Sequence, residues 1–175
     1  MLVRTLESLP LATFLIYLAL ARPQRLEDWL WPYSLSSVLA ILALGALRLT
    51  GQIANRIYLG IAAYFLSGAL ALVLHWRSVN AWYGAVEAAA MFCWVCVVGM
   101  LTTVASPQGF IGLDTGFRDR TRQASLLLLG AALLATALSF GFIGRMFLHA
   151  YLPFVALFAV QALLRARYSR CSGQL

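Results

Sequence analysis

The chain has 175 residues, of which 62% are hydrophobic and only 11% are charged. Soluble domains are about half apolar and about a quarter charged, so this composition excludes an ordinary soluble enzyme, a disordered tail and a free nucleic-acid-binding domain. The sequence therefore predicts an integral membrane protein of several spans. The net charge of +7 comes from 13 arginines against six acidic residues, and in a membrane protein such an excess reports topology and headgroup contacts.

The predicted fold is all-α, a polytopic membrane helix bundle with five or six transmembrane helices in one integral membrane domain, residues 1–175. Each crossing needs about 20 apolar residues, and open strand edges do not survive in hydrocarbon. The expected spans, in chain order, are 9–21, 29–47, 57–75, 79–105, 123–143 and 146–164. The first run has Ser8 as its candidate N-cap and Pro10 in its first turn. Because it is short, we expect it either to span with tilt or bilayer thinning, or to be re-entrant.

The distribution of arginines predicts the orientation of the spans. With six spans, nine arginines fall on one side and four on the other. The positive-inside rule then places both termini on the cytoplasmic side of the membrane. If 9–21 does not cross, only the N-terminus changes side, and the C-terminus stays cytoplasmic. The larger group is Arg4, Arg48, Arg56, Arg118, Arg120, Arg122, Arg165, Arg167 and Arg170, and the smaller is Arg22, Arg25, Arg77 and Arg145.

Aromatic residues near the outer ends of the second, third and fourth runs predict an interfacial belt at headgroup depth. They are Trp29, Trp31, Tyr33, Trp76, Trp82 and Tyr83. Small residues recur at four-residue spacing within the runs 57–75, 79–105 and 123–143. Such stripes let membrane helices approach closely, so they predict a compact bundle or a homo-oligomer face and do not decide between the two.

The longest inner loop, residues 106–123, contains three glycines and three arginines. We expect a flexible surface loop whose arginines contact anionic lipid, because no Gly-Lys-Ser or Gly-Lys-Thr follows and no strand precedes it. Cys93 and Cys96 form a CxxC pattern inside an apolar run and lack a second pair. They are therefore interpreted as packing residues.

Polar groups inside a membrane are costly, so each is a functional hypothesis. The candidate polar cluster on the outer side is Glu87, His75, His149, Arg77 and Arg145. Three interpretations stay open: two histidines and a glutamate holding a metal or a haem, an ion pair of Glu87 with Arg77 or Arg145, or a proton or substrate path through Glu87. No HxxxH, HExxH or GxSxG pattern is present. No catalytic residue, metal or other cofactor and no nucleic-acid partner are therefore predicted.

Two stretches resemble the intracellular septation protein A family, the YciB-like inner-membrane proteins. Residues 7–14, ESLPLATF, are similar to that family's acidic-x-Leu-Pro-Leu-x-x-Phe start, and residues 67–75 are similar to its Gly-Gly-Leu-Thr-Leu and Phe-His motif. Trp82 follows His75 at the family spacing, but the lysines that flank this tryptophan in the family correspond to Ala81 and Tyr83. Only Pro10, His75 and Trp82 map onto the motifs, and the resemblance implies no catalytic residues.

The resemblance implies a location in a bacterial inner (plasma) membrane and a role in cell-envelope upkeep and septation. The first hypothesis is therefore a non-enzymatic inner-membrane protein acting through helix and lipid contacts, with the bilayer, other division or envelope proteins, and a second copy of the chain as its expected partners. The alternative is a small transporter or membrane-enzyme subunit with an outer-side polar site around Glu87, His75 and His149.

Overall fold

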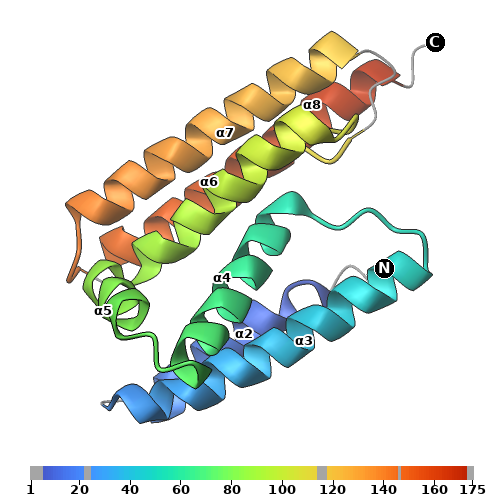
Figure 1. The fold of residues 1–175 in the computed structure, drawn as a ribbon. Coiled ribbons are helices and arrows are strands. Elements are labelled where there is room, and N and C mark those ends of the chain that lie inside the picture. Colours follow the sequence, from blue (N-terminus) through green and yellow to red (C-terminus); the bar gives the residue numbers. More distant parts are fainter. Residues whose placement is uncertain (1–5, 22–24, 114–117, 146, 173–175) are drawn as a thin grey trace. The chain divides into compact units, whose positions relative to one another are not determined.

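The computed structural model describes residues 6–21, 25–113, 118–145 and 147–172, and within these ranges every regular element is a helix (Figure 1). This confirms the predicted all-α class. Five segments are long and apolar enough to cross a membrane: Glu27–Leu49, Arg56–Val73, Ala88–Ala105, Arg118–Gly141 and Phe147–Tyr168. The helix α2, Leu9–Ala21, is apolar but shorter. The chain divides into two compact units, Met1–Ala85 and Val86–Leu175.

The first unit is built on three consecutive helices in which α2 packs on α3 and α3 packs on α4. Its elements after α2 are η1 (Leu26–Trp29), α3 (Leu30–Leu49), α4 (Arg56–Val73) and α5 (Arg77–Val86). Asn55 is the N-cap of α4, and its side chain accepts the Ile57 N–H at 3.1 Å. The buried carboxylate of Glu7 in turn accepts the Asn55 N–H at 3.2 Å. The acidic residue of the 7–14 stretch therefore fixes the start of α4.

Aromatic rings fill the core of this unit. Phe14 lies 5.3 Å from Tyr33 and 4.8 Å from Phe65, measured between ring centroids. The hydroxyls of Tyr33 and Tyr64 are hydrogen-bonded to each other, and the Tyr83 hydroxyl lies 2.6 Å from the Ser67 hydroxyl.

These bonds correct part of the predicted interfacial belt. Tyr33 and Tyr83 are buried because their hydroxyls find partners inside the unit, which removes the cost of taking them from water. Trp31, Trp76 and Trp82 are exposed, as residues of such a belt would be.

A close approach between α3 and α4 depends on Gly68. A Cβ atom built there would lie 2.3 Å from Cε1 of Tyr33. We expect Gly68→Ala to lower the free energy of unfolding by about 1–3 kcal/mol, because the ring has to move out of a packed core. Denaturation of the purified protein in detergent measures the change. Gly45→Ala in α3 is the matched control, since its Cβ would meet nothing within 4 Å. Equal losses in the two variants would contradict the packing role.

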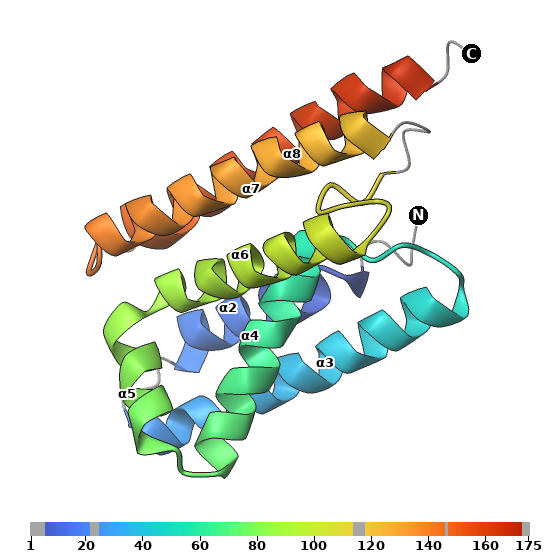
Figure 2. The same ribbon diagram turned by 45° about the horizontal axis from the view of Figure 1, so that its top comes forward.

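The second unit contains α6 (Ala88–Ala105), α7 (Arg118–Gly141), the π-helical turn η2 (Phe147–Tyr151) and α8 (Leu152–Ser172). The helix α7 packs on both α6 and α8, and η2 contacts all three. Figure 2 shows α7 and α8 side by side along their length. The Phe92 and Phe154 rings, 4.5 Å apart between centroids, add a direct contact between α6 and α8.

The described part of the 106–123 loop is packed, which corrects the expectation of a flexible surface loop. Phe110 and Ile111 are fully buried, and the Ile111 N–H donates to the Ser125 hydroxyl at 3.3 Å. Gly109 has φ +57°, and a Cβ there would lie 2.1 Å from that same hydroxyl oxygen. This glycine therefore allows a tight fold of the loop against α7. Gly116 lies outside the described residues.

The run expected to be one helix over 79–105 is interrupted at Glu87. The short helix α5 ends at Val86 and α6 begins at Ala88. Between them Glu87 has φ 48° and ψ −125°, a conformation that cannot continue a helix. The apolar pattern contains no proline at this point, so hydrophobicity alone does not reveal the break.

Candidate functional site

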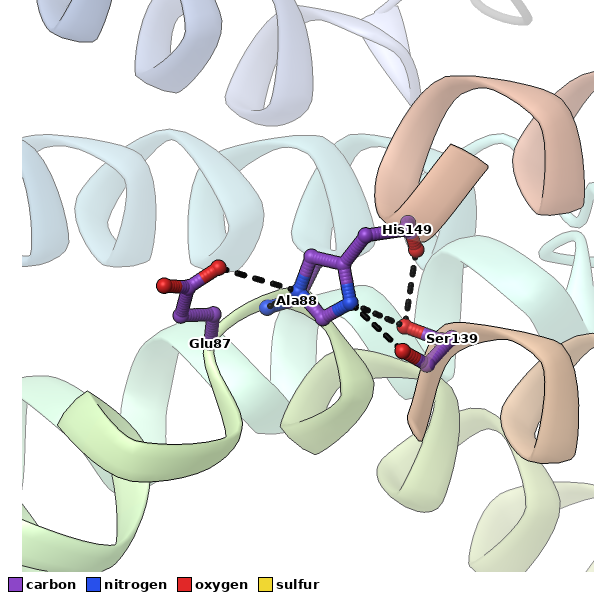
Figure 3. Close-up of polar contacts among 4 residues, drawn as sticks. All are labelled: Glu87, Ala88, Ser139 and His149. Atoms are coloured by element: carbon purple, nitrogen blue, oxygen red, sulfur yellow. Dashed lines mark hydrogen bonds and ion pairs between the residues drawn. The ribbon is translucent and has the colours of Figure 1, made fainter. Parts of the chain in front are cut away.

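The interruption at Glu87 brings together a carboxylate and an imidazole from distant parts of the second unit. Oε2 of Glu87 lies 3.3 Å from Nε2 of His149 (Figure 3). The His149 side chain is only 3% exposed, whereas the Glu87 side chain is 52% exposed. The pair therefore links a buried titratable ring to the protein surface through one contact.

The first backbone group of α6 completes one side of this site. In a continuous helix the Ala88 N–H would donate to the carbonyl of Gly84, but the break at Glu87 removes that partner. His149 replaces it, since Nε2 lies 3.0 Å from the Ala88 nitrogen. A backbone donor thus fixes the imidazole at the start of the span.

The other side of the ring is held by Ser139 in α7. Nδ1 of His149 lies 2.7 Å from the Ser139 carbonyl oxygen and 3.1 Å from its hydroxyl oxygen. The Ser139 hydroxyl donates to the His149 carbonyl oxygen at 2.7 Å. That carbonyl needs an outside donor because Pro153, four residues later, has no N–H. The π-helical turn that contains His149 and the hydrogen bond from Ser139 to the His149 carbonyl oxygen both occur one turn before this proline.

The hydrogen bonds define the protonation state of the ring. A carbonyl oxygen only accepts, so Nδ1 carries a proton and donates it to Ser139. Nε2 accepts the Ala88 N–H, so the ring is neutral in this arrangement. The Glu87 carboxylate then faces an unprotonated nitrogen at 3.3 Å. An additional proton on Nε2 would donate to Oε2 in a charge-assisted hydrogen bond, and the Ala88 N–H would then give up Nε2 as its acceptor.

The backbone at Glu87 is itself unusual. A non-glycine residue at φ 48° and ψ −125° is held in a sparsely populated region that costs about 1–3 kcal/mol. Such outliers cluster at functional sites, where the surrounding structure imposes them. Glycine would fit this position without strain. A carboxylate therefore occupies a position at which the backbone favours glycine.

The expected ion pair of Glu87 with Arg77 or Arg145 is wrong. Among the described residues, the group beside the Glu87 carboxylate is Nε2 of His149 at 3.3 Å. Arg77 is exposed at the first position of α5, and Arg145 is exposed after α7. Arg145 meets the site only through its backbone carbonyl, which accepts the His149 N–H at 2.9 Å.

His75 is a helix-terminating residue rather than part of this pair. Its backbone has φ 52°, its N–H donates to Leu72 O at 3.1 Å, and the Trp76 N–H donates to Ala71 O at 2.9 Å. These two bonds form a Schellman motif that ends α4. The exposed ring lies 3.0 Å from the Val73 carbonyl oxygen through Nδ1. Of the other two motif residues, Pro10 is buried in α2 and Trp82 is exposed on α5.

The capping role of His75 predicts an asymmetric response to substitution. His75→Gly should match or exceed the wild-type stability, because glycine adopts positive φ without cost. His75→Val should lower the free energy of unfolding by about 1–2 kcal/mol, because a β-branched residue is strained there. Thermal unfolding in detergent separates the two variants. Equal damage by glycine and valine would show that the ring itself is required.

Three features of the site were missed by sequence reasoning: the Ala88 N–H, the helix break beside it and the role of Ser139. Ser139 is one of the small residues at four-residue spacing in the run 123–143, and that spacing predicts only helix packing. A signal for its role is present, because Pro153 leaves the carbonyl of His149 in need of a donor. Among the described residues no group of three or more His, Cys, Asp or Glu side chains is arranged to hold a metal ion.

Comparisons with known proteins add no relative. No family model matches the chain, and neither a curated protein nor a solved structure matches it. The fold and the site together define the class, an all-α multi-pass membrane protein with a carboxylate–imidazole pair at the start of one span.

Proposed function

We propose that this membrane protein takes up and releases a proton at the Glu87–His149 pair, and that it is a small proton-coupled transporter or a subunit of one. The observation that carries the proposal is the 3.3 Å contact between Oε2 of Glu87 and the unprotonated Nε2 of His149. The half-exposed carboxylate exchanges protons with water, and the buried imidazole holds them.

None of the other described groups that contact the His149 ring competes with Glu87 and His149 for this proton. The N-cap residue Glu87 and the Ala88 N–H lie at the start of α6, and Ser139 lies in α7. Within η2 the neighbouring titratable residue Tyr151 is exposed. A serine hydroxyl and backbone groups do not gain or lose protons near neutral pH. One proton at a time therefore occupies the space between Oε2 and Nε2.

The orientation proposed from the arginine count sets the direction of exchange. The pair lies at the end of α7 that is opposite to Arg118, Arg120 and Arg122. With the arginine-rich end in the cytoplasm of a bacterial plasma membrane, Glu87 faces the outer side. Proton uptake would then follow the pH outside the cell.

Reconstitution into vesicles that contain a pH-sensitive dye tests the proposal. Under an imposed potential, wild-type protein should acidify the lumen faster than protein-free vesicles, and Glu87→Gln should fall to the protein-free rate. The amide keeps the shape of the carboxylate and cannot take the proton. His75→Gly, altered only at a helix end, should keep the wild-type rate. A Glu87→Gln variant that acidifies as fast as wild type contradicts the proposal.

A second proposal is the envelope and septation role implied by the resemblance. It is supported by the contacts of the matching stretches, since Glu7 fixes the start of α4 and His75 its end. Such residues maintain a fold that acts through partners rather than through chemistry. Crosslinking in membranes with division and envelope proteins, and the envelope phenotype of a deletion, test this role. The absence of both a crosslinked partner and an envelope phenotype would contradict this role.

A further inference from the structure

A concentration of arginines lies at the end of the second unit opposite to the Glu87–His149 pair. The helices α7 and α8 run antiparallel, so the start of α7 and the end of α8 lie together (Figures 1 and 2). This arginine end consists of Arg118, Arg120, Arg122, Arg165 and Arg167. Asp119 is the one carboxylate that the described residues of these two helix ends contain.

The arginines lie where the apolar parts of the two helices stop. In α7 the sequence changes from RDRTRQ to ASLLLL, and in α8 it changes from ALL to RAR. If α7 and α8 span the bilayer, these guanidinium groups are at the depth of the lipid phosphates. Arg118, Arg122 and Arg167 are exposed and therefore able to meet a ligand from the membrane surface.

The guanidinium group of Arg165 is held in one orientation by hydrogen bonds. Its Nε and Nη2 atoms donate to the Ile111 carbonyl oxygen at 3.3 and 3.2 Å. Ile111 is itself fully buried and bonded to Ser125. The packed 106–113 segment therefore orients one guanidinium in advance, which lowers the entropic cost of binding an anion beside it.

We propose that the arginine end binds an anionic phospholipid headgroup, with exposed guanidinium groups of α7 and α8 contacting the lipid phosphate. Guanidinium matches phosphate through paired N–H donors, and the surplus of positive charge favours lipids with a net negative headgroup over zwitterionic ones. The depth of the arginines favours a lipid over a free phosphate ion, since the lipid is anchored beside them. This inference is independent of the proton-binding proposal.

Native mass spectrometry and thermal unfolding in a neutral detergent test the site. Phosphatidylglycerol added to the full-length protein should remain bound and raise the unfolding temperature. The double variant Arg118→Gln with Arg122→Gln should bind it about 25-fold more weakly, at about fivefold for each arginine. The matched control, Arg77→Gln with Arg145→Gln, removes the same charge elsewhere and should bind as wild type. Arg167→Gln alone tests the contribution of α8 and should weaken binding about fivefold.

Several outcomes would overturn the lipid site. The site is contradicted if the Arg118→Gln, Arg122→Gln variant binds phosphatidylglycerol as tightly as the wild type does. It is also contradicted if the wild type binds phosphatidylcholine as tightly as phosphatidylglycerol. If inorganic phosphate alone raises the unfolding temperature as much as phosphatidylglycerol, the arginine end takes a free anion and not a lipid. If the control variant Arg77→Gln with Arg145→Gln binds phosphatidylglycerol equally weakly, the loss reflects the net charge of the protein and not a site at the arginine end.

Discussion

Replacing His149 by leucine is expected to abolish proton uptake and to lower the free energy of unfolding by about 1–3 kcal/mol. The ring bonds to the Ala88 N–H on one side and to the Ser139 carbonyl on the other. Leucine fills a similar volume but offers no acceptor, so the first donor of α6 loses its partner. Thermal unfolding and proton uptake of the purified protein measure the two effects.

His149→Gln is the matched control for this loss. Its amide oxygen can accept from Ala88 and its amide nitrogen can donate to Ser139, so stability should stay near the wild-type value. A glutamine side chain does not bind a proton near neutral pH, so proton uptake should still be lost. The account of the site is contradicted if leucine leaves the stability unchanged, or if the glutamine variant still takes up a proton.

Three substitutions at Glu87 are expected to separate its backbone strain from its chemistry. Glu87→Gly should be at least as stable as wild type and should exceed Glu87→Ala by about 1–3 kcal/mol, because glycine removes the cost of φ 48°. Glu87→Gln should keep the wild-type fold. All three should lose proton uptake, because each removes the carboxylate beside Nε2.

The same purified variants, measured for unfolding in detergent and for proton uptake in vesicles, test this separation. A glycine variant that is more stable yet inactive would mean that the strained glutamate is kept for its carboxylate. A glycine variant less stable than alanine would contradict the strain at Glu87. A glycine variant that still takes up protons would contradict the role of the carboxylate.

The sequence predicted the fold class well because apolar runs of span length report burial in lipid whatever the neighbours are. The same reasoning treated 79–105 as one helix and missed the break. Hydropathy averages over the side chains and does not sense φ at Glu87, where the break is accompanied by the bond between Ala88 and His149. The break therefore depends on a contact between residues 61 positions apart.

For the site, the sequence identified Glu87 and His149 because polar groups are rare in such a chain. It gave Glu87 the wrong partner, since an arginine was the expected counter-charge and distances between helices are not encoded in spacing. The sequence makes His75 an equal candidate, yet the structure uses it to end α4. Only tertiary contacts distinguish these two histidines, because both follow apolar runs of similar character.

The most direct test of the proton-binding claim is ¹⁵N NMR of the His149 imidazole. The chain has two histidines, so His75→Gly leaves His149 as the single reporter. When the sample is acidified, Nδ1 should stay protonated while Nε2 gains a proton. In the double variant His75→Gly with Glu87→Gln, Nε2 should stay unprotonated under the same acidification, because a buried imidazolium then has no anion beside it. Identical protonation of Nε2 with and without the Glu87 carboxylate would contradict a shared proton.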